Sequence, residues 1–428
     1  MYFTTIVPLL PYAVSCGMKF ADYGLDPDII RQLDKLKFKR PTDIQYKCIP
    51  HILRGEDILA VAQTGTGKTA AFAIPIIQLI HDKKKKERRA DGIKCIVLVP
   101  THELAEQITG VFNEIGKHTQ VRTLGIFGGV DQDPQIADLQ NRNDIIVATP
   151  GRLFDLISQG HLRINRVEIL ILDEADYMLD LGFIDDIHDL RKKLPKRRQT
   201  LFFSATINDY IKKLAYKIIH QKAIRIQVSP KNPVARNVEH SVAFIDMDDK
   251  RFFLERFIRE HPDDKILVFV RTKVRAERVL KAMKRVEISA VNIHGDKEQA
   301  DRTHAMKLFK SGINKLLIAT DVSARGIDIP QVEYVINYDL PDRPENYVHR
   351  VGRTGRGRHK GQAVSFCAPQ EMDMLKEIQQ YIGAPIAVSD VSKTDYETTV
   401  LLSQDDEKDW KKLMEMGEDI LSKRKKKK

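Results

Sequence analysis

The chain has 428 residues, 42% of them hydrophobic and 30% charged, and at about 100–200 residues per domain this length predicts a globular protein of two or three domains. Lys and Arg number 70 against 59 Asp and Glu, and the formal net charge of +11 favours a polyanionic partner over an acidic small substrate. The four cysteines are scattered, which argues against a zinc site or a disulfide framework and indicates a reducing, cytoplasmic setting.

The N-terminal segment, MYFTTIVPLLPYAVSCG, is apolar and uncharged. It lacks the basic start of a secretory signal, and Pro8 and Pro11 interrupt it. We expect a disordered lead-in over residues 1–17, or a true start at Met18; a lipoprotein-type signal ending at Cys16 is the less favoured alternative. No apolar run is long enough to span a bilayer, so no membrane partner is predicted.

Short apolar runs alternate with helical patterns along the first half of the chain. Six runs fall at 57–62, 94–100, 122–127, 144–149, 168–173 and 200–205. They are continuous rather than alternating in polarity, as expected for parallel strands that are covered on both faces. Their spacing predicts repeated βαβ units with right-handed crossovers.

The same rhythm restarts after residue 240, with runs at 265–270, 288–293, 315–320, 332–338 and 362–366. Between the halves, SPKNPVARN (229–237) contains two prolines and no periodicity, which is typical of a linker. We therefore expect two α/β domains, 18–228 and 239–382, with a linker over 229–238. A charged extension over 383–428 should follow and end in a lysine-rich tail.

A glycine-rich loop, AQTGTGKT (62–69), lies between the first predicted strand and a predicted helix. The P-loop pattern requires a Gly where this chain has Ala62, so the loop is a variant. Its chemistry is intact: backbone N–H groups and a helix N-terminus can face a phosphate, Lys68 can bridge the β- and γ-phosphates, and Thr69 can ligate Mg²⁺. An ordinary turn is the alternative, and the flanking strand and helix disfavour it.

The fifth apolar run ends in the acidic sequence DEAD (173–176). A P-loop site needs a carboxylate at the end of a neighbouring strand to hold Mg²⁺, and the carboxyl ends of parallel strands share one edge of a sheet. Asp173 is therefore predicted to bind the metal. Glu174 is predicted to contact it through water and to orient or deprotonate the water that attacks the γ-phosphate. A helix N-cap with an acidic first turn is the alternative.

From about residue 18 to 382 the chain resembles the DEAD-box ATP-dependent RNA helicases, in particular the bacterial RhlE-type group. The motifs that carry the resemblance stand in the family's order: FKRPTDIQ (38–45), AQTGTGKT (62–69), PTHELAEQ (100–107), GG (128–129), TPGR (149–152), DEAD (173–176), SAT (204–206), VFVRT (268–272), HGDKEQADR (294–302), ATDVSARGID (319–328) and HRVGRTGR (349–356). The resemblance implies two tandem RecA-like domains. Each would be a mostly parallel sheet covered by helices on both faces, and a short basic C-terminal extension would follow.

The resemblance also implies how ATP would be held. Gln45 would read the adenine edge, because an amide offers both a donor and an acceptor. Phe38 would lie against the base and Phe20 is the candidate for an isolated upstream aromatic; core packing is the alternative for both rings. The other implied nucleotide contacts are Gln63, Thr64, Gly65, Thr66, Gly67, Lys68, Thr69, Gly326 and Asp328.

Further roles are implied by the same resemblance. Arg353 and Arg356 resemble arginine fingers, which stabilise the charge on a transferring phosphoryl group; a general basic RNA patch is the alternative. The residues implied to couple ATP to RNA are Asp176, Ser204, Thr206, His349 and Arg350. The residues implied to contact the RNA backbone and its 2′-hydroxyl groups are Thr101, Glu103, Gly129, Thr149, Arg152, Thr272, Gly295, Gln299, Arg302 and Thr320.

Three positions depart from the family's usual pattern. His102 stands where the family usually has Arg, which puts a phosphate contact or a structural ion pair in doubt. Tyr177 replaces an expected Arg after the acidic quartet. Ser323 replaces the more common Ala, which is a mild change.

These features together predict an ATP-dependent RNA helicase, an RNA-stimulated ATP hydrolase with ATP and Mg²⁺ as cofactors. Closure of its domains would grip the RNA backbone and locally unwind short duplexes. We expect a cytoplasmic monomer that acts on RNA, with ribonucleoprotein or RNA-decay partners. An ATP-gated RNA clamp and a DNA translocase are the alternatives. The terminal SKRKKKK (422–428) is predicted either to tether RNA or only to solubilise the chain.

Overall fold

The computed structural model describes residues 18–63, 65–87, 92–206, 209–219, 223–228, 234, 237–324, 329, 332–355, 360–389, 392 and 394–400. The chain divides into a first unit, Met1–Pro230, and a second unit, Lys231–Lys428, and the division falls inside the predicted linker. The predictions for Thr64, Gly326, Asp328 and Arg356, for the lead-in and for the lysine-rich tail lie outside the described residues.

A parallel seven-stranded sheet forms the centre of the first unit. Its strands are β1 (Ile58–Ala62), β2 (Cys95–Leu98), β3 (Thr123–Ile126), β4 (Ile145–Ala148), β5 (Ile169–Leu172), β6 (Gln199–Ser204) and β7 (Ile224–Val228), in the spatial order β3-β4-β2-β5-β6-β1-β7. The first six lie in the six predicted runs or within one residue of them. The sequence did not predict β7, because IRIQV alternates in polarity as a half-exposed edge strand does.

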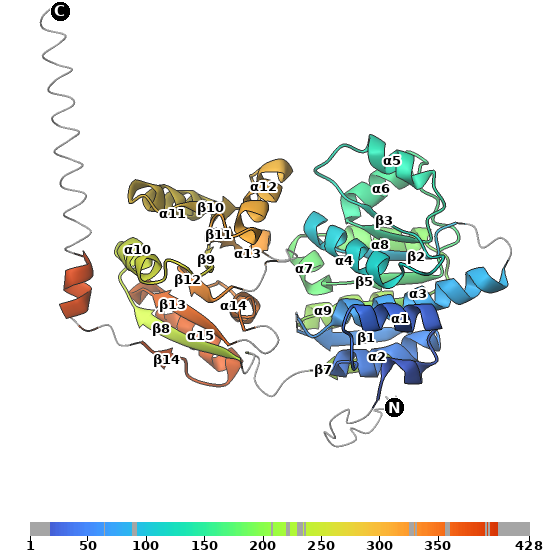
Figure 1. Cartoon of the computed structure of the whole chain (residues 1–428), viewed down its shortest axis with the longest axis horizontal. Coiled ribbons are helices and arrows are strands. Elements are labelled where there is room, and N and C mark those ends of the chain that lie inside the picture. The colour runs from blue at the N-terminus through green and yellow to red at the C-terminus, as the bar shows by residue number, and fades with distance from the viewer. Residues whose placement is uncertain are drawn as a thin grey trace, which may run out of the picture. The chain divides into compact units, whose positions relative to one another are not determined.

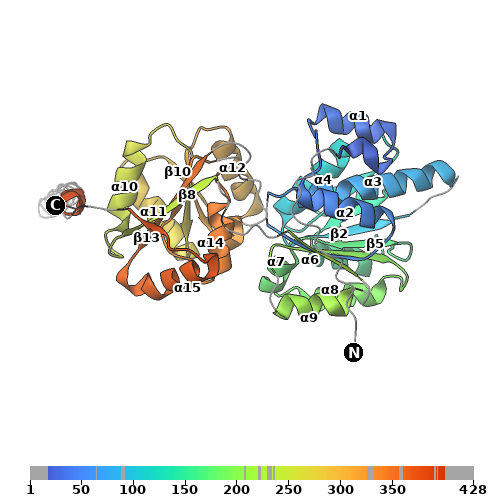
Figure 2. The same ribbon diagram turned by 90° about the horizontal axis from the view of Figure 1, so that it is seen from below.

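Helices cover both faces of this sheet, as Figures 1 and 2 show. On one face lie η1 (Phe20–Tyr23), α1 (Pro27–Lys35), α2 (Asp43–Leu53), α3 (Lys68–Lys86) and α4 (His102–Ile115). On the other lie α5 (Asp133–Leu139), α6 (Pro150–Ser158), α7 (Ala175–Asp180), α8 (Ile184–Lys193) and α9 (Asp209–Ile218). A hydrophobic core lies on each face of the sheet, and consecutive residues of a strand point to opposite faces. Phe203 of β6 therefore packs against α3, whereas Phe202 packs in the core on the other face.

The second unit repeats this architecture. Its strands are β8 (Val238–Phe244), β9 (Ile266–Val270), β10 (Ala290–Ile293), β11 (Leu316–Thr320), β12 (Tyr334–Asn337), β13 (Gly361–Cys367) and β14 (Ala387–Val388), in the order β10-β11-β9-β12-β13-β8-β14. One core lies under α12 (Gln299–Lys310), α14 (Pro344–Val351) and α15 (Met372–Ile382), and the other under α10 (Lys250–Glu260) and α11 (Lys273–Arg285). The short helices α13 (Asp321–Ala324) and η2 (Pro369–Glu371) follow β11 and β13.

Part of the predicted extension belongs to the second unit. The strand β14 pairs with β8, and Ser389 N donates a hydrogen bond to Val242 O at 2.8 Å. Further on, the Tyr396 ring packs against Phe253 of α10, with 4.9 Å between the ring centroids and a tilt of 50°, and its hydroxyl donates to Asp249 Oδ2 at 2.8 Å. The sheet is therefore completed by residues beyond 382, the predicted end of the domain.

The predicted fold class is confirmed: each unit is a parallel sheet between two layers of helices. Among the helices that the structure describes, none combines the length and apolar character needed to cross a membrane.

Candidate nucleotide and RNA site

The glycine-rich loop leaves β1 and opens α3. Gly65 and Gly67 have φ angles of 80° and 92°, in the left-handed region that favours glycine, and Gly67 is the N-cap of α3. The backbone therefore turns directly onto a helix N-terminus, where free N–H groups and the helix dipole attract phosphate. The predicted strand–loop–helix context is present.

Two side chains from the segment before β1 hold this loop. Thr42 Oγ1 donates to Thr66 O at 2.8 Å, and Gln45 Nε2 donates to Gly67 O at 3.1 Å. Gln45 Oε1 accepts from Thr42 N at 2.9 Å. A Cβ atom on Gly67 would lie 2.5 Å from Gln45 Nε2, so the contact also requires glycine. Both ends of the Gln45 amide are engaged within the protein, and its reading of adenine stays a prediction.

Lys68 is the first residue of α3 and its side chain is buried. The residue is 7% exposed, and among the described residues its Nζ has no hydrogen-bond partner. Because a buried ammonium group without a partner is costly, the position fits a bound anion.

Asp173 lies directly after β5 and is 2% exposed. Burial raises the pKa of its carboxyl group, and the positive charge of Lys68 opposes that rise. Glu174 N donates to Asp173 Oδ1 at 3.0 Å. A carboxylate held out of water near an unpaired ammonium group suits a site that takes a cation together with phosphates.

These residues fit Mg²⁺ bound with a nucleotide rather than a metal held by the protein alone. Within the described ranges no three His, Cys, Asp or Glu side chains gather into a metal cluster. Mg²⁺ commonly keeps several waters and is held by one or two carboxylates together with substrate phosphates. Asp173 and Thr69 offer the oxygen ligands that such a site uses.

The DEAD sequence contacts the SAT motif. Glu174 has φ 51° and ψ 46°, a left-handed conformation that is rare for a residue with a side chain and is typical of functional sites. Asp176 Oδ2 accepts hydrogen bonds from Thr206 N and Oγ1, both at 3.1 Å, and Ser204 Oγ donates to Thr206 O at 2.7 Å. Asp176 therefore contacts the SAT motif within the first unit, and its role in coupling ATP to RNA stays a prediction.

His102 and Tyr177, which depart from the family's pattern, are both inside the first unit. The His102 ring stacks on Phe127 at 3.7 Å between centroids, with Nε2 3.4 Å from Glu106 Oε1. Tyr177 is 3% exposed in α7. An aromatic ring suits both environments; nothing in the structure explains further why Tyr177 replaces Arg.

The predicted RNA contacts of the first unit lie where strands end. Thr101, Gly129 and Thr149 follow β2, β3 and β4, at the edge of the sheet that also carries Asp173. Thr101 Oγ1 caps α4 by accepting from Leu104 N at 3.3 Å, with Glu103 in the same turn. In a further contact at this edge, Arg152 Nη2 donates to Val130 O at 2.7 Å.

The second unit arranges its predicted RNA contacts in the same way. Thr272 and Gly295 follow β9 and β10, and Thr320 ends β11. Thr272 Oγ1 caps α11 by accepting from Arg275 N at 3.1 Å. At the start of α12, Arg302 Nη1 donates to Gln299 Oε1 at 3.2 Å.

Arg350 of α14 links the HRVGRTGR and ATDVSARGID motifs within the second unit, and its role in coupling ATP to RNA stays a prediction. It is 1% exposed, and its Nε and Nη2 donate to Asp321 Oδ1 and Oδ2 at 2.6 and 2.7 Å. His349 precedes it in the same helix. Arg353, one turn later, is 6% exposed.

Sequence reasoning missed Thr42 and underrated Ser323. Thr42 and Gln45 form the T-x-x-Q pattern of a capping box, which was visible in the sequence. The Ser323 hydroxyl lies 3.0 Å from Thr320 Oγ1 and 2.8 Å from Ile293 O. In the sequence, these contacts of Ser323 were indicated only by the presence of Ser where the family more commonly has Ala.

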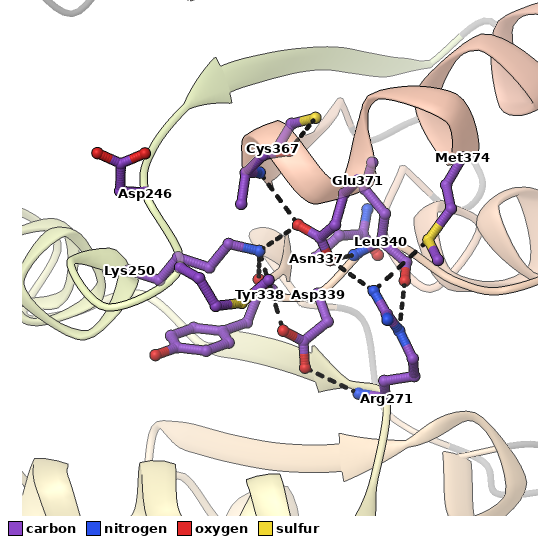
Figure 3. A network of polar contacts seen from close by, with 12 residues as sticks. Asp246, Lys250, Arg271, Asn337, Tyr338, Asp339, Leu340, Cys367, Glu371 and Met374 are labelled. Atoms are coloured by element: carbon purple, nitrogen blue, oxygen red, sulfur yellow. Dashed lines mark hydrogen bonds and ion pairs between the residues drawn. The ribbon is translucent and has the colours of Figure 1, made fainter.

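Sequence reasoning also missed a buried ionic network in the second unit (Figure 3). Lys250 Nζ donates to Glu371 Oε2 at 2.5 Å and to Tyr338 O at 2.7 Å, and Arg271 Nη2 donates to Glu371 Oε1 at 2.6 Å. Since Arg271 directly precedes Thr272, the network fixes the end of β9 where an RNA contact is predicted.

Comparisons with known proteins agree with this geometry. Residues 42–214 match the DEAD/DEAH box helicase domain, and residues 249–358 match the helicase conserved C-terminal domain. The ATP-dependent RNA helicase CshA of Listeria monocytogenes is 40% identical over 362 residues, which are 85% of this chain and 68% of that protein.

Solved structures show the same fold. S. cerevisiae Dbp5 bound to RNA and ADP BeF3 has a TM-score of 0.79 and 30% identity, covering 91% of this chain and 99% of that chain. Mss116 bound to ssRNA and UDP-BeF has a TM-score of 0.79 and 29% identity, covering 89% and 81%. The likeness to the RhlE-type group stays a prediction. With both helicase domains matched and relatives at 40% identity over most of its length, the chain belongs to the DEAD-box family of ATP-dependent RNA helicases.

Proposed function

We propose that this protein binds ATP with Mg²⁺ and uses ATP hydrolysis to grip RNA by its backbone and separate short duplexes. The observation that carries the proposal is the buried Nζ of Lys68, which has no hydrogen-bond partner among the described residues and acts electrostatically on the buried carboxylate of Asp173. This pair lies at the end of the glycine-rich loop and fits the phosphates and metal of a bound nucleotide.

Different residues of the first unit contact the phosphates, the metal and the attacking water. Lys68 and the loop N–H groups hold the β- and γ-phosphates, while Thr69 and Asp173 hold Mg²⁺. When bound, the metal neutralises phosphate charge and so eases attack at the γ-phosphorus. Glu174 orients the attacking water and accepts its proton.

Closure of two domains completes the site. The helicase ATP-binding domain covers about 18–228, and the C-terminal helicase domain runs from about 239 through 382 and includes β14 beyond it. Arg353 and Arg356 belong to the second domain and act at the γ-phosphate only in the closed state. ATP and RNA each favour that state, so the binding of one strengthens the binding of the other.

The RNA contacts suit the backbone rather than the bases. The predicted residues are mainly threonines and glycines at strand ends, which can meet phosphates and 2′-hydroxyl groups without reading sequence. The relatives Dbp5 and Mss116, which have been solved with RNA, support RNA as the partner. We expect the enzyme to act as a cytoplasmic monomer with ribonucleoprotein or RNA-decay partners.

Glu174→Gln tests the mechanism. The variant should bind ATP and RNA as the wild type does but hydrolyse ATP at least about 100-fold more slowly, because an amide cannot accept the proton. RNA-stimulated phosphate release and the fluorescence anisotropy of labelled RNA measure the two properties. Glu168→Gln is the matched control, since Glu168 stands just before the same strand and is paired at the surface with Lys83 at 2.6 Å. Wild-type turnover in the Glu174 variant would contradict the assigned role.

Matched RNA and DNA substrates test the choice of partner and the outcome. RNA should stimulate hydrolysis more than DNA of equal length, and ATP should drive separation of a short RNA duplex. ATP-dependent retention of RNA without strand separation would identify a clamp instead. Equal stimulation by DNA would contradict RNA specificity.

A further inference from the structure

Helix α11 carries a row of exposed cations. Arg278, Lys281 and Arg285 stand at positions i, i+3 and i+7, which share one face of a helix, and Lys284 lies beside them. All four are exposed. Within the part of the chain that the structure describes, no hydrogen bond or ion pair neutralises any of them.

The other charges of this helix are already engaged. Lys273 Nζ lies 2.6 Å from Asp296 Oδ2, and Arg275 Nε lies 3.2 Å from Asp339 Oδ1. Glu277, the one acidic residue of α11, accepts hydrogen bonds from Asn292 at 2.9 Å and pairs with His294 at 2.8 Å. It is therefore held by the end of β10 and leaves the row of cations uncompensated.

The neighbouring helix α10 shows the ordinary arrangement. Its Arg256 and Arg259 form ion pairs with Glu260 and Glu255, at 2.8 and 2.9 Å, on the same helix. Surfaces that are merely solvated usually mix both signs of charge in this way. The face of α11 does not, so it is suited to a polyanion.

The row also leads away from the predicted RNA contacts. Helix α11 begins directly after Thr272, at the edge of the sheet where the RNA contacts are predicted. It ends at Arg285, before β10 begins, so the helix runs back along the sheet and away from that edge (Figure 1). At a rise of about 1.5 Å per residue, Arg278, Lys281 and Arg285 stand about 9, 14 and 20 Å along the helix from Thr272.

We propose that this face of α11 is an auxiliary track for the RNA backbone. An RNA held at Thr272 and its neighbours continues over the helix, where its phosphates meet Arg278, Lys281 and Arg285. The inference rests on the proposed RNA function and extends it. Because guanidinium and ammonium groups bind phosphates without reading bases, the track is independent of sequence. It is used only by RNA that extends beyond the segment held at the sheet edge.

The test is the full-length variant R278Q/K281Q/R285Q with a non-hydrolysable ATP analogue. Glutamine keeps a high helix propensity, so α11 should remain folded. Two labelled single-stranded RNAs are compared: one of about 8 nucleotides, within the range of single-strand site sizes, and one of about 30. We expect the long RNA to bind about 10-fold more weakly at low salt, with its salt slope reduced by about 2, because each lost phosphate contact removes about 0.7. Affinity for the short RNA should be unchanged, and so should the ATPase rate that the short RNA stimulates when ATP replaces the analogue.

R191Q/K193Q/K196Q is the matched control, because it removes three exposed cations from the end of α8 and its following turn. It should bind both RNAs as the wild type does. If the α11 variant binds the long RNA as tightly as the wild type does, the proposed RNA track on α11 is wrong. The proposal is also wrong if the control loses as much affinity for the long RNA as the α11 variant, because this would indicate a general effect of charge. An equal loss on the short RNA would place these residues in the main site instead. Failure of the wild type to bind either RNA would be a separate result, against the proposed function itself.

Discussion

Single hydroxyl groups set the geometry of the predicted RNA edge. The Ser323 hydroxyl lies within hydrogen-bonding distance of Thr320 N, Thr320 Oγ1 and Ile293 O, and it is 2% exposed. It therefore joins the ends of β10 and β11, each of which leads to a predicted RNA contact. An Ala at this position would leave the Thr320 side chain free to turn.

Ser323→Ala should weaken ATP-dependent RNA binding about 5-fold, the worth of one neutral hydrogen bond of about 1 kcal/mol, because Thr320 loses its orienting partner. The Michaelis constant for ATP should not change. In a Thr320→Val variant, Ser323→Ala should have little further effect on RNA binding, because the Thr320 hydroxyl that Ser323 orients is already absent. RNA titrations of the two single variants and the double variant measure this coupling, and additive losses would show that Ser323 does not act through Thr320.

At the scale of elements, the ionic network of Figure 3 joins four parts of the second unit. Lys250 of α10 is 0% exposed and Glu371 of η2 is 1% exposed. Glu371 also accepts from Leu340 N at 3.1 Å and from Arg271 after β9. Burial lowers the pKa of Lys250 and the charge of Glu371 opposes that change. The network holds the start of α11 against the sheet through groups that would be costly to bury alone.

Glu371→Gln should destabilise the second unit by about 3–5 kcal/mol, because buried Lys250 loses its hydrogen-bonded carboxylate and keeps only Asp339 Oδ1, 3.9 Å away, as a counter-charge among the described residues. Scanning calorimetry of the full chain measures the loss of stability. The unfolding transition whose temperature an ATP analogue does not change is assigned to the second unit. Glu260→Gln removes an exposed partner of Arg256 instead and should change stability by about 0.5 kcal/mol or less. If Glu371→Gln and Glu260→Gln lower the stability equally, burial of the ion pair does not account for the contribution of Glu371.

At the scale of the molecule, the residues predicted for hydrolysis are divided between the two units. Lys68, Asp173 and Glu174 belong to the first, and Arg353 belongs to the second. Under the proposed mechanism each unit supplies only part of the chemistry, so we expect hydrolysis to depend on RNA, which would favour the closed state.

Arg353→Lys should lower the RNA-stimulated turnover number about 10³-fold, since a lysine cannot replace the planar guanidinium at the transferring phosphoryl group. ATP binding by the first unit should change little. Steady-state kinetics and equilibrium binding of a fluorescent ATP analogue separate the two effects. Arg343→Lys, at the exposed N-cap of α14, the helix that ends two residues before Arg353, is the control and should leave turnover unchanged. Normal turnover in the Arg353 variant would remove it from the reaction.

The strands that the sequence missed share a physical cause. The run IRIQV of β7 alternates because it is an edge strand, and β14 has only two residues. In β8, charged and polar residues interrupt VEHSVAF near the edge that β14 covers. Nine of the eleven predicted runs lie between two neighbouring strands, which explains their continuous apolar pattern. The other two, β3 and β10, are edge strands that are only partly buried, and their own apolar residues were enough to find them.

The sequence by itself determined the strand pattern, the phosphate loop and the placement of Asp173 at a strand end, because each depends on neighbouring residues. Only the tertiary structure decided which polar groups meet. Gln45 holds Gly67, Asp176 binds Thr206, and Lys250 pairs with Glu371 across 121 residues of chain. Local periodicity carries no information about such contacts, since burial and the packing of distant elements select each partner.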